Sequence, residues 1–169
     1  MARPVSDLVG ALSEHEVRYL LVGGAALELH GSSYVTQDVD VVYERSPENV
    51  RRLVLALAPF EPRCRVQGEP GGLPMHWHER TILNGDNFTL TTTVGDLDLL
   101  GIVAPGWRYE ELVERFGARY EVEGLAVDML TLEGLRETKR AADRPKDHIA
   151  IPEIEAMIEA RDLSSGEPT

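Results

Sequence analysis

Polar and apolar residues alternate over residues 37–43, which read Gln-Asp-Val-Asp-Val-Val-Tyr. Successive side chains of a strand point to opposite faces, so Asp38 and Asp40 would share one face and the valines between them the other. The apolar run at residues 18–22 shows no alternation and ends in glycine, which is typical of a strand buried on both faces. We therefore predict two strands of one sheet, the first buried and the second half-buried.

The other elements follow from helical periodicity, caps and turns. Helices are predicted at residues 6–16, 25–30, 47–57, 109–116, 132–142 and 152–161. Two strand pairs, 88–93 with 96–100 and 119–122 with 125–130, are joined by short turns that contain glycine. Residues 59–72 carry poor signals, and residues 70–72 within them are predicted to form a turn or mobile loop. The pattern predicts a chain of the α/β (α+β) class; the mixed twisted sheet, flanking helices and C-terminal helical segment expected of it are what the family resemblance described below implies.

Composition is that of an ordinary globular protein. The chain has 169 residues, of which 43% are hydrophobic and 27% charged. This length suits one domain, predicted at residues 1–163 and followed by a flexible tail at 164–169. No apolar run is long enough to cross a bilayer, and the N-terminus lacks the apolar stretch of a secretory signal. With Cys64 as its single cysteine the chain has no internal disulfide, and we expect a cytoplasmic protein with no membrane partner.

The net charge of -12 argues against non-specific binding of nucleic acid, which depends on neutralising phosphates. The charge is uneven, because a basic run at residues 136–146 precedes an acidic segment at residues 147–169. The basic run is either the solvated face of a helix or a local phosphate-binding patch. Composition alone does not decide between these two interpretations.

A glycine pair, Gly23-Gly24, lies between the first predicted strand and the helix that follows it. Glycine lets the backbone approach a phosphate closely, and the first turn of a helix offers unpaired N–H groups to an anion. Asp38 and Asp40, on the next strand, would raise one another's pKa unless a cation lay beside them. Magnesium prefers a few carboxylates together with phosphate oxygens. The two motifs together therefore indicate a site for a nucleoside triphosphate and its magnesium ions.

A third carboxylate would complete such a site, and the predicted strand at residues 96–100 offers two. Asp98 is flanked by leucines, as a carboxylate emerging from a buried strand would be, and is the first choice. Asp96 would point to the same side and is the alternative. A third acid can both bind a metal ion and accept the proton of an attacking hydroxyl.

These motifs, in this order, resemble the signature of the DNA polymerase beta-type nucleotidyltransferase superfamily. That signature is a hydrophobic residue with Gly-Gly or Gly-Ser, then Asp-hydrophobic-Asp, then an acid on a later strand. Thr36 and the segment at residues 132–147 further resemble the small prokaryotic branch that includes abortive-infection (AbiEii-type) and toxin–antitoxin nucleotidyltransferases. The resemblance runs from about residue 18 to residue 158 and implies the nucleotidyltransferase fold.

Carried over residue by residue, the resemblance implies roles for the matching positions of this chain. Asp38, Asp40 and Asp98 would bind Mg²⁺ or Mn²⁺, and Asp98 would also be the general base. The residues expected to contact the triphosphate are Gly23, Gly24, Thr36, Lys139, Arg144 and Lys146, and Asp147 would orient the last three. The implied reaction transfers a nucleoside monophosphate to a hydroxyl acceptor and releases pyrophosphate.

The acceptor stays open between RNA, protein and a small molecule, so tRNA, a protein substrate and a cognate toxin or antitoxin are all candidate partners. One position departs from the pattern, because relatives in this branch have arginine two residues before the threonine and this chain has Tyr34. The first hypothesis is an active enzyme, since the acids and the glycine pair are retained. The alternative is a weakly active or inactive protein that acts as a regulatory or antitoxin-like binding partner, which Tyr34 and the short chain favour.

Overall fold

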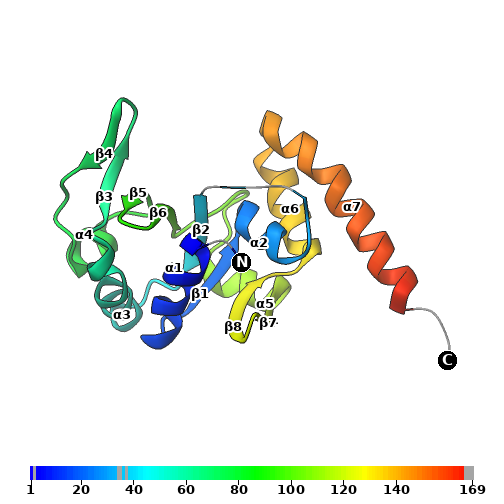
Figure 1. The fold of residues 1–169 in the computed structure, drawn as a ribbon, viewed down its shortest axis with the longest axis horizontal. Coiled ribbons are helices and arrows are strands. Elements are labelled where there is room, and N and C mark those ends of the chain that lie inside the picture. The colour runs from blue at the N-terminus through cyan, green and yellow to red at the C-terminus, as the bar shows by residue number, and fades with distance from the viewer. Residues whose placement is uncertain (2, 34–35, 37, 166–169) are drawn as a thin grey trace.

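A mixed sheet of eight strands runs through the computed structural model, which describes residues 1, 3–33, 36 and 38–165 (Figure 1). The strands are β1 (Tyr19–Val22), β2 (Asp38–Tyr43), β3 (Arg63–Val66), β4 (Glu69–Leu73), β5 (Asn87–Thr92), β6 (Gly95–Leu100), β7 (Gly117–Val122) and β8 (Leu125–Leu130). Their order in the sheet is β4-β3-β5-β6-β2-β1-β8-β7. β2 pairs with β6 in parallel, as β1 does with β8, and the other neighbours are antiparallel.

Two groups of helices pack on the sheet and on one another. The helices are α1 (Arg3–Glu14), α2 (Gly23–Leu29), α3 (Pro47–Leu57), α4 (Glu79–Asn84), α5 (Tyr109–Phe116), α6 (Leu132–Ala142) and α7 (Pro145–Ser165), with a 3-10 turn at Ala58–Phe60. α3 packs against α1 and α4, whereas α6 packs against α2, α5 and α7. The C-terminal half of α7 extends away from the body of the molecule (Figure 1). Among the described residues, none of the helices combines the length and apolarity needed to cross a bilayer.

The centre of the sheet confirms the strands expected from the alternation of residues. Leu21 of β1 is fully buried, and so are Leu97 and Leu99 of β6. The predicted hairpins are also present, because β5 pairs with β6 and β7 with β8 in the expected antiparallel register. The turn between β7 and β8 consists of Glu123 and Gly124, both with positive φ, as two-residue hairpins favour.

Residues 59–72, where the signals were poor, form regular elements, and the turn or mobile loop predicted at residues 70–72 is wrong, because these residues belong to β4. The structure has the 3-10 turn there and then the hairpin of β3 and β4 at the edge of the sheet. Most of β4 is exposed, and the register shifts between Cys64 and Val66, so this hairpin leaves no alternating apolar pattern in the sequence. Gly72, which has a positive φ, approaches the backbone of Cys64 too closely for a side chain. The glycines that indicated a loop are here compatible with an edge strand.

The C-terminal helix is also longer than predicted. A helix start was expected at Pro152, because proline is common at the first position of a helix. The structure instead begins α7 at Pro145 and continues it through Pro152. The prediction of a tail from residue 164 is wrong for Ser164 and Ser165, which belong to α7. Residues 166–169 lie outside the described part of the chain.

Candidate active site

The parallel pairing of β2 and β6 places four carboxylates side by side. In the register of the two strands, Asp38 is opposite Asp96 and Asp40 is opposite Asp98. Both strands alternate, so the valines and leucines between these acids point to the other face and are buried. We call Asp38, Asp40, Asp96 and Asp98 the carboxylate cluster.

The glycine turn (Gly23-Gly24) ends β1 directly beside this cluster. Gly23 has a φ of +65°, and a Cβ added to it would lie 2.2 Å from Oδ2 of Asp40. A Cβ on Gly24 would lie 2.8 Å from Cβ of Thr36. Only residues without side chains allow the start of α2 to approach Asp40 and Thr36 so closely. The two glycines therefore fix how the turn is seated against the carboxylates.

A substitution at Gly23 tests this close approach. We expect Gly23→Ala to lower the free energy of unfolding by about 2 kcal/mol or more, because the left-handed backbone and the contact with Asp40 both disfavour a side chain. Urea denaturation would measure the change. Gly10→Ala is the matched control, since Gly10 lies within α1 with no atom within 4 Å of an added Cβ. That control should be neutral or stabilise by up to about 1 kcal/mol. Equal stability of the two variants would contradict the geometry.

A cavity of about 320 Å³ opens in front of the carboxylate cluster. On one side lie the glycine turn, Thr36 and the acids Asp38, Asp40 and Asp98. The same cavity is lined by the cations Lys139 of α6, Arg144 just before α7 and Lys146 of α7. The structure thus brings together around one cavity every residue that the resemblance matched to a metal ligand or a triphosphate contact. Asp96 does not line it, and Tyr34, the departing position, lies outside the described residues.

Asp147 is fully buried behind the cations and connects two of them. It accepts a hydrogen bond from Nζ of Lys139 at 3.2 Å and another from Nε of Arg144 at 2.7 Å. Burial acts to raise the pKa of Asp147, but the hydrogen bonds from Arg144 and Lys139 outweigh it and lower this pKa below its usual value. Asp147 therefore holds α6 and α7 together as an ionised carboxylate.

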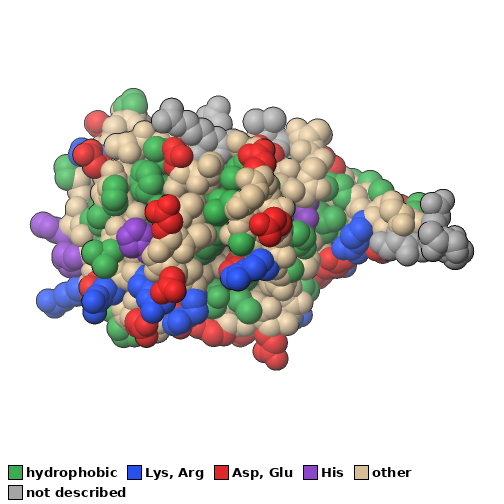
Figure 2. All heavy atoms as spheres, turned by 60° about the horizontal axis from the view of Figure 1, so that its bottom comes forward, with side chains coloured by type: hydrophobic (Ala, Val, Ile, Leu, Met, Phe, Trp, Pro, Cys, Tyr) green, Lys and Arg blue, Asp and Glu red, His purple; other side chains and the backbone are tan. Residues whose placement is uncertain are grey.

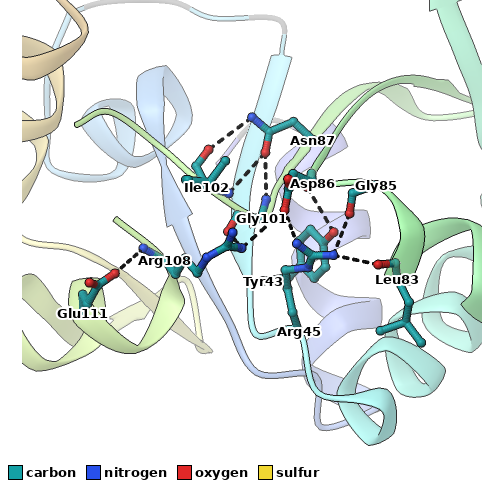
Figure 3. A network of polar contacts seen from close by, with 10 residues as sticks. All are labelled: Tyr43, Arg45, Leu83, Gly85, Asp86, Asn87, Gly101, Ile102, Arg108 and Glu111. Carbon is teal, nitrogen blue, oxygen red and sulfur yellow. Dashed lines mark hydrogen bonds and ion pairs between the residues drawn. The ribbon is translucent and has the colours of Figure 1, made fainter. Parts of the chain in front are cut away.

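Another wall of the cavity is formed by the end of β6 and the segment after it, through Leu100, Ile102, Val103 and Ala104. Asn87 fixes this segment, because its side-chain oxygen accepts hydrogen bonds from the backbone N–H groups of Gly101 and Ile102, and its amide donates to the carbonyl of Ile102 (Figure 3). Beside it, the guanidinium of Arg45 donates to Asp86 and to the carbonyls of residues 83 and 85 (Figure 3). This network attaches the wall to the end of β2 and to the loop before β5.

Burial and like charge disfavour the ionised forms of Asp40 and Asp98, two members of the carboxylate cluster. The pKa of Asp40 is raised to about 6, mainly by burial and next by the negative charge of Asp98, while Lys146 opposes the rise. Burial also raises the pKa of Asp98, against the opposing positive charge of Arg65. Both carboxylates would become easier to ionise if a cation entered the site.

Arg65 of β3 belongs to the site, although the sequence did not reveal it. Its Nη1 lies 2.8 Å from Oδ2 of Asp96 and 3.5 Å from Oδ1 of Asp38, and its Nη2 donates to Oδ1 of Asp98 at 2.7 Å. Residues 63–66 carried no clear strand signal, so nothing in the sequence placed this guanidinium beside β6. The spacing of Arg63 and Arg65, which puts both on one face of a strand, was the available signal.

The donor set of the cavity suits a divalent cation. Asp38 and Asp40 supply hard oxygen ligands of the kind that Mg²⁺ and Mn²⁺ prefer, and the raised pKa of Asp40 shows that added positive charge would be stabilising. Within the described part of the chain, no three acidic, histidine or cysteine side chains are already arranged around a common point for a metal ion. Asp98 is instead held by Arg65.

Comparison with known proteins supports the fold. The sequence matches no protein-family model and no curated protein. The lincosamide antibiotic adenylyltransferase LnuA, crystallised with lincomycin bound, matches with a TM-score of 0.63 at 12% identity, over 93% of this chain and 98% of that one. ANT(2″)-Ia in complex with adenylyl-2″-tobramycin gives a TM-score of 0.52 at 14% identity, over 96% and 97% of the two chains.

A putative nucleotidyltransferase from Thermotoga maritima also matches, with a TM-score of 0.53 at 13% identity over 99% of this chain and 97% of that one. At such identities the likeness concerns the fold alone. This chain has the nucleotidyltransferase fold, as the sequence motifs predicted. The finer resemblance to the abortive-infection and toxin–antitoxin branch stays a prediction.

Proposed function

We propose that this protein is a metal-dependent nucleotidyltransferase that transfers a nucleoside monophosphate from a nucleoside triphosphate to a hydroxyl acceptor. The observation that carries the proposal is the cavity in which Asp38, Asp40 and Asp98 face a group of cations beside the glycine turn. Negative charge on one side suits a divalent cation, and positive charge on the other suits phosphates. A nucleoside triphosphate with its metal ion has both kinds of charge.

Each side of the cavity would have its own task in the reaction. The backbone of the glycine turn, Thr36, and the cations Lys139, Arg144 and Lys146 would bind the triphosphate. Asp38 and Asp40 would hold the divalent cation, which supplies positive charge to the phosphate oxygens when bound. Asp98 would accept the proton of the acceptor hydroxyl. The hydroxyl oxygen forms a bond to the α-phosphorus, the bond from that phosphorus to the bridging oxygen breaks, and pyrophosphate leaves with the bond electrons.

A small molecule is the acceptor that we favour. Two structures with this fold were solved with lincomycin and with adenylyl-2″-tobramycin. A second cavity, of about 480 Å³, adjoins the first at Thr36 and Asp38 and gives room for a small acceptor. The net charge of -12 disfavours tRNA, and the face seen in Figure 2 has acidic side chains spread among basic and hydrophobic ones.

A second candidate function is that of an inactive or weakly active binding partner, such as an antitoxin. The specific observation in its favour is Arg65, whose guanidinium pairs with Asp98 and Asp96 where an enzyme of this kind would need free carboxylates. A role in a toxin–antitoxin pair or in phage defence is compatible with either candidate.

Transfer of labelled nucleotide would decide between the two. The purified chain is incubated with Mg²⁺, each labelled ribonucleoside triphosphate in turn, and either total RNA, a protein lysate or a panel of small hydroxyl compounds. We expect release of pyrophosphate and label in the small-molecule fraction. Asp38→Ala with Asp40→Ala should abolish both, whereas Asp162→Ala, an exposed acid of α7, should change neither. Absence of transfer, together with no thermal shift on adding nucleotide and metal, would favour the second candidate.

A further inference from the structure

Arg65 reaches the carboxylate cluster from a strand that does not carry any of its acids. β3 is two places from β6 in the sheet, with β5 between them. Backbone pairing of Arg63 with Thr91 and of Cys64 with Leu90 attaches β3 to β5 just before Arg65. The guanidinium therefore extends from an anchored backbone across β5 to the acids of β6 and β2.

The contacts of Arg65 make it a resident cation rather than a surface side chain. Its side chain is 25% exposed, and its two terminal nitrogens lie within 3.5 Å of three different aspartates. Asp96 is held from the other side by the hydroxyl of Thr91, so it is fixed to receive the guanidinium. Arg65 thereby offsets part of the negative charge that the parallel register of β2 and β6 concentrates at one place.

Arg65 offsets the negative charge of only part of the carboxylate cluster. Arg65 lies close to Asp96, Asp98 and one oxygen of Asp38, whereas no ion pair links it to Asp40. Asp40 lies instead against the glycine turn, on the side of the cavity where a triphosphate would lie. One half of the cluster therefore already has a cation from the protein, and the other half has none of comparable proximity among the described ion pairs.

We propose that Arg65 takes the place of one of the two divalent cations that three carboxylates could share, so that this site binds a single divalent ion, at Asp38 and Asp40. The proposal rests on the proposed function, because it assumes that a divalent ion binds there. Asp98 is then not a metal ligand but a carboxylate held by Arg65 and facing the cavity. Its remaining role is to accept the proton of the acceptor hydroxyl.

Counting bound Mn²⁺ tests this proposal without any catalytic turnover. The full chain is titrated with Mn²⁺ alone, and free Mn²⁺ is measured by electron paramagnetic resonance. We expect one ion per unaltered chain. Arg65→Met, which keeps an unbranched side chain and removes the guanidinium with its charge, should bind two ions, the first about fivefold to tenfold more tightly than in the unaltered chain because a nearby positive charge is gone.

Two further variants serve as controls. Arg63→Met removes a neighbouring arginine of β3 that donates to the carbonyl of Gly72, and Arg65→Lys keeps the positive charge. Both should bind one ion. Two ions on the unaltered chain, or one on Arg65→Met, would overturn the inference and leave the proposed function standing. No bound ion on either would overturn both. The number of Mn²⁺ ions bound to the unaltered chain can be measured without any variant. The inference can therefore be refuted even if Arg65→Met does not fold.

Discussion

Asp40→Asn is expected to reduce nucleotidyl transfer by about a thousandfold or more, while the free protein becomes more stable. The loss of activity follows because Asp40 would be a ligand of the divalent cation, and an amide holds Mg²⁺ far more weakly than a carboxylate. Rates of pyrophosphate release for the variant and the unaltered chain would measure it. If the variant kept even a tenth of the activity, the proposed role of Asp40 as a ligand of the divalent cation would be contradicted.

The gain in stability has a defined dependence on pH. Burial raises the pKa of Asp40 to about 6, so ionisation of this group destabilises the native state as the pH rises through that value. Asparagine removes this penalty. With EDTA present, we expect the variant to unfold at a higher urea concentration than the unaltered chain at pH 8, by up to about 3 kcal/mol, and at a similar one near pH 4. Asp162→Asn, at an exposed position of α7, should show no such difference.

Asp147→Asn is expected to have the largest effect on stability. The carboxylate is fully buried, and its loss would leave the ammonium of Lys139, whose side chain is only 11% exposed, without its partner. Removing one member of a buried ion pair costs several kcal/mol, and because Arg144 is half exposed we expect a loss of about 3 kcal/mol. Urea denaturation near pH 7 would measure it, and the KM for the nucleotide should rise as well, because Lys139 and Arg144 lose their orientation.

The sign of the pH dependence is opposite at this position. Hydrogen bonds lower the pKa of Asp147 in the folded state, so its contribution is present above the ordinary aspartate pKa and is lost as the pH falls through the lower folded value. The stability difference between Asp147→Asn and the unaltered chain should therefore shrink below about pH 4. Asp143→Asn is a matched control at a side chain that is 78% exposed, and it should change stability by less than about 0.5 kcal/mol. An equal loss in both variants would contradict the role of Asp147.

The half of the site that follows local patterns could be predicted from the sequence. Alternation along residues 38–43 places Asp38 and Asp40 on one face whatever the sheet order, and the glycine turn is a property of two adjacent residues. The choice of Asp98 needed only the alternation of β6. These inferences depend on the two-residue period of a strand and on the conformational freedom of glycine. Both can be read from a single short segment of the sequence.

The other half depends on which strands are neighbours, and local patterns do not contain that information. Arg65 enters the cluster because β3 pairs with β5 and β5 with β6, and the order of strands is set by packing of the whole chain. The hairpin that carries it is exposed and irregular in register, so its residues lack the alternation that would have revealed it. The helix start expected at Pro152 rested on local sequence alone, whereas α7 begins at Pro145, continues through Pro152 and packs against α6.

The segment after β6 that lines the cavity is held mainly through its backbone. Asn87 holds this segment through backbone groups of Gly101 and Ile102, so the side chain of Ile102 is not needed to keep it in place, whereas that of Val103 packs against the core. Both residues line the cavity without contributing a charge. A substitution at Ile102 would change the shape of the cavity and leave the aspartates where they are. Variation at this one position can therefore alter which molecules fit the cavity without altering its charged groups.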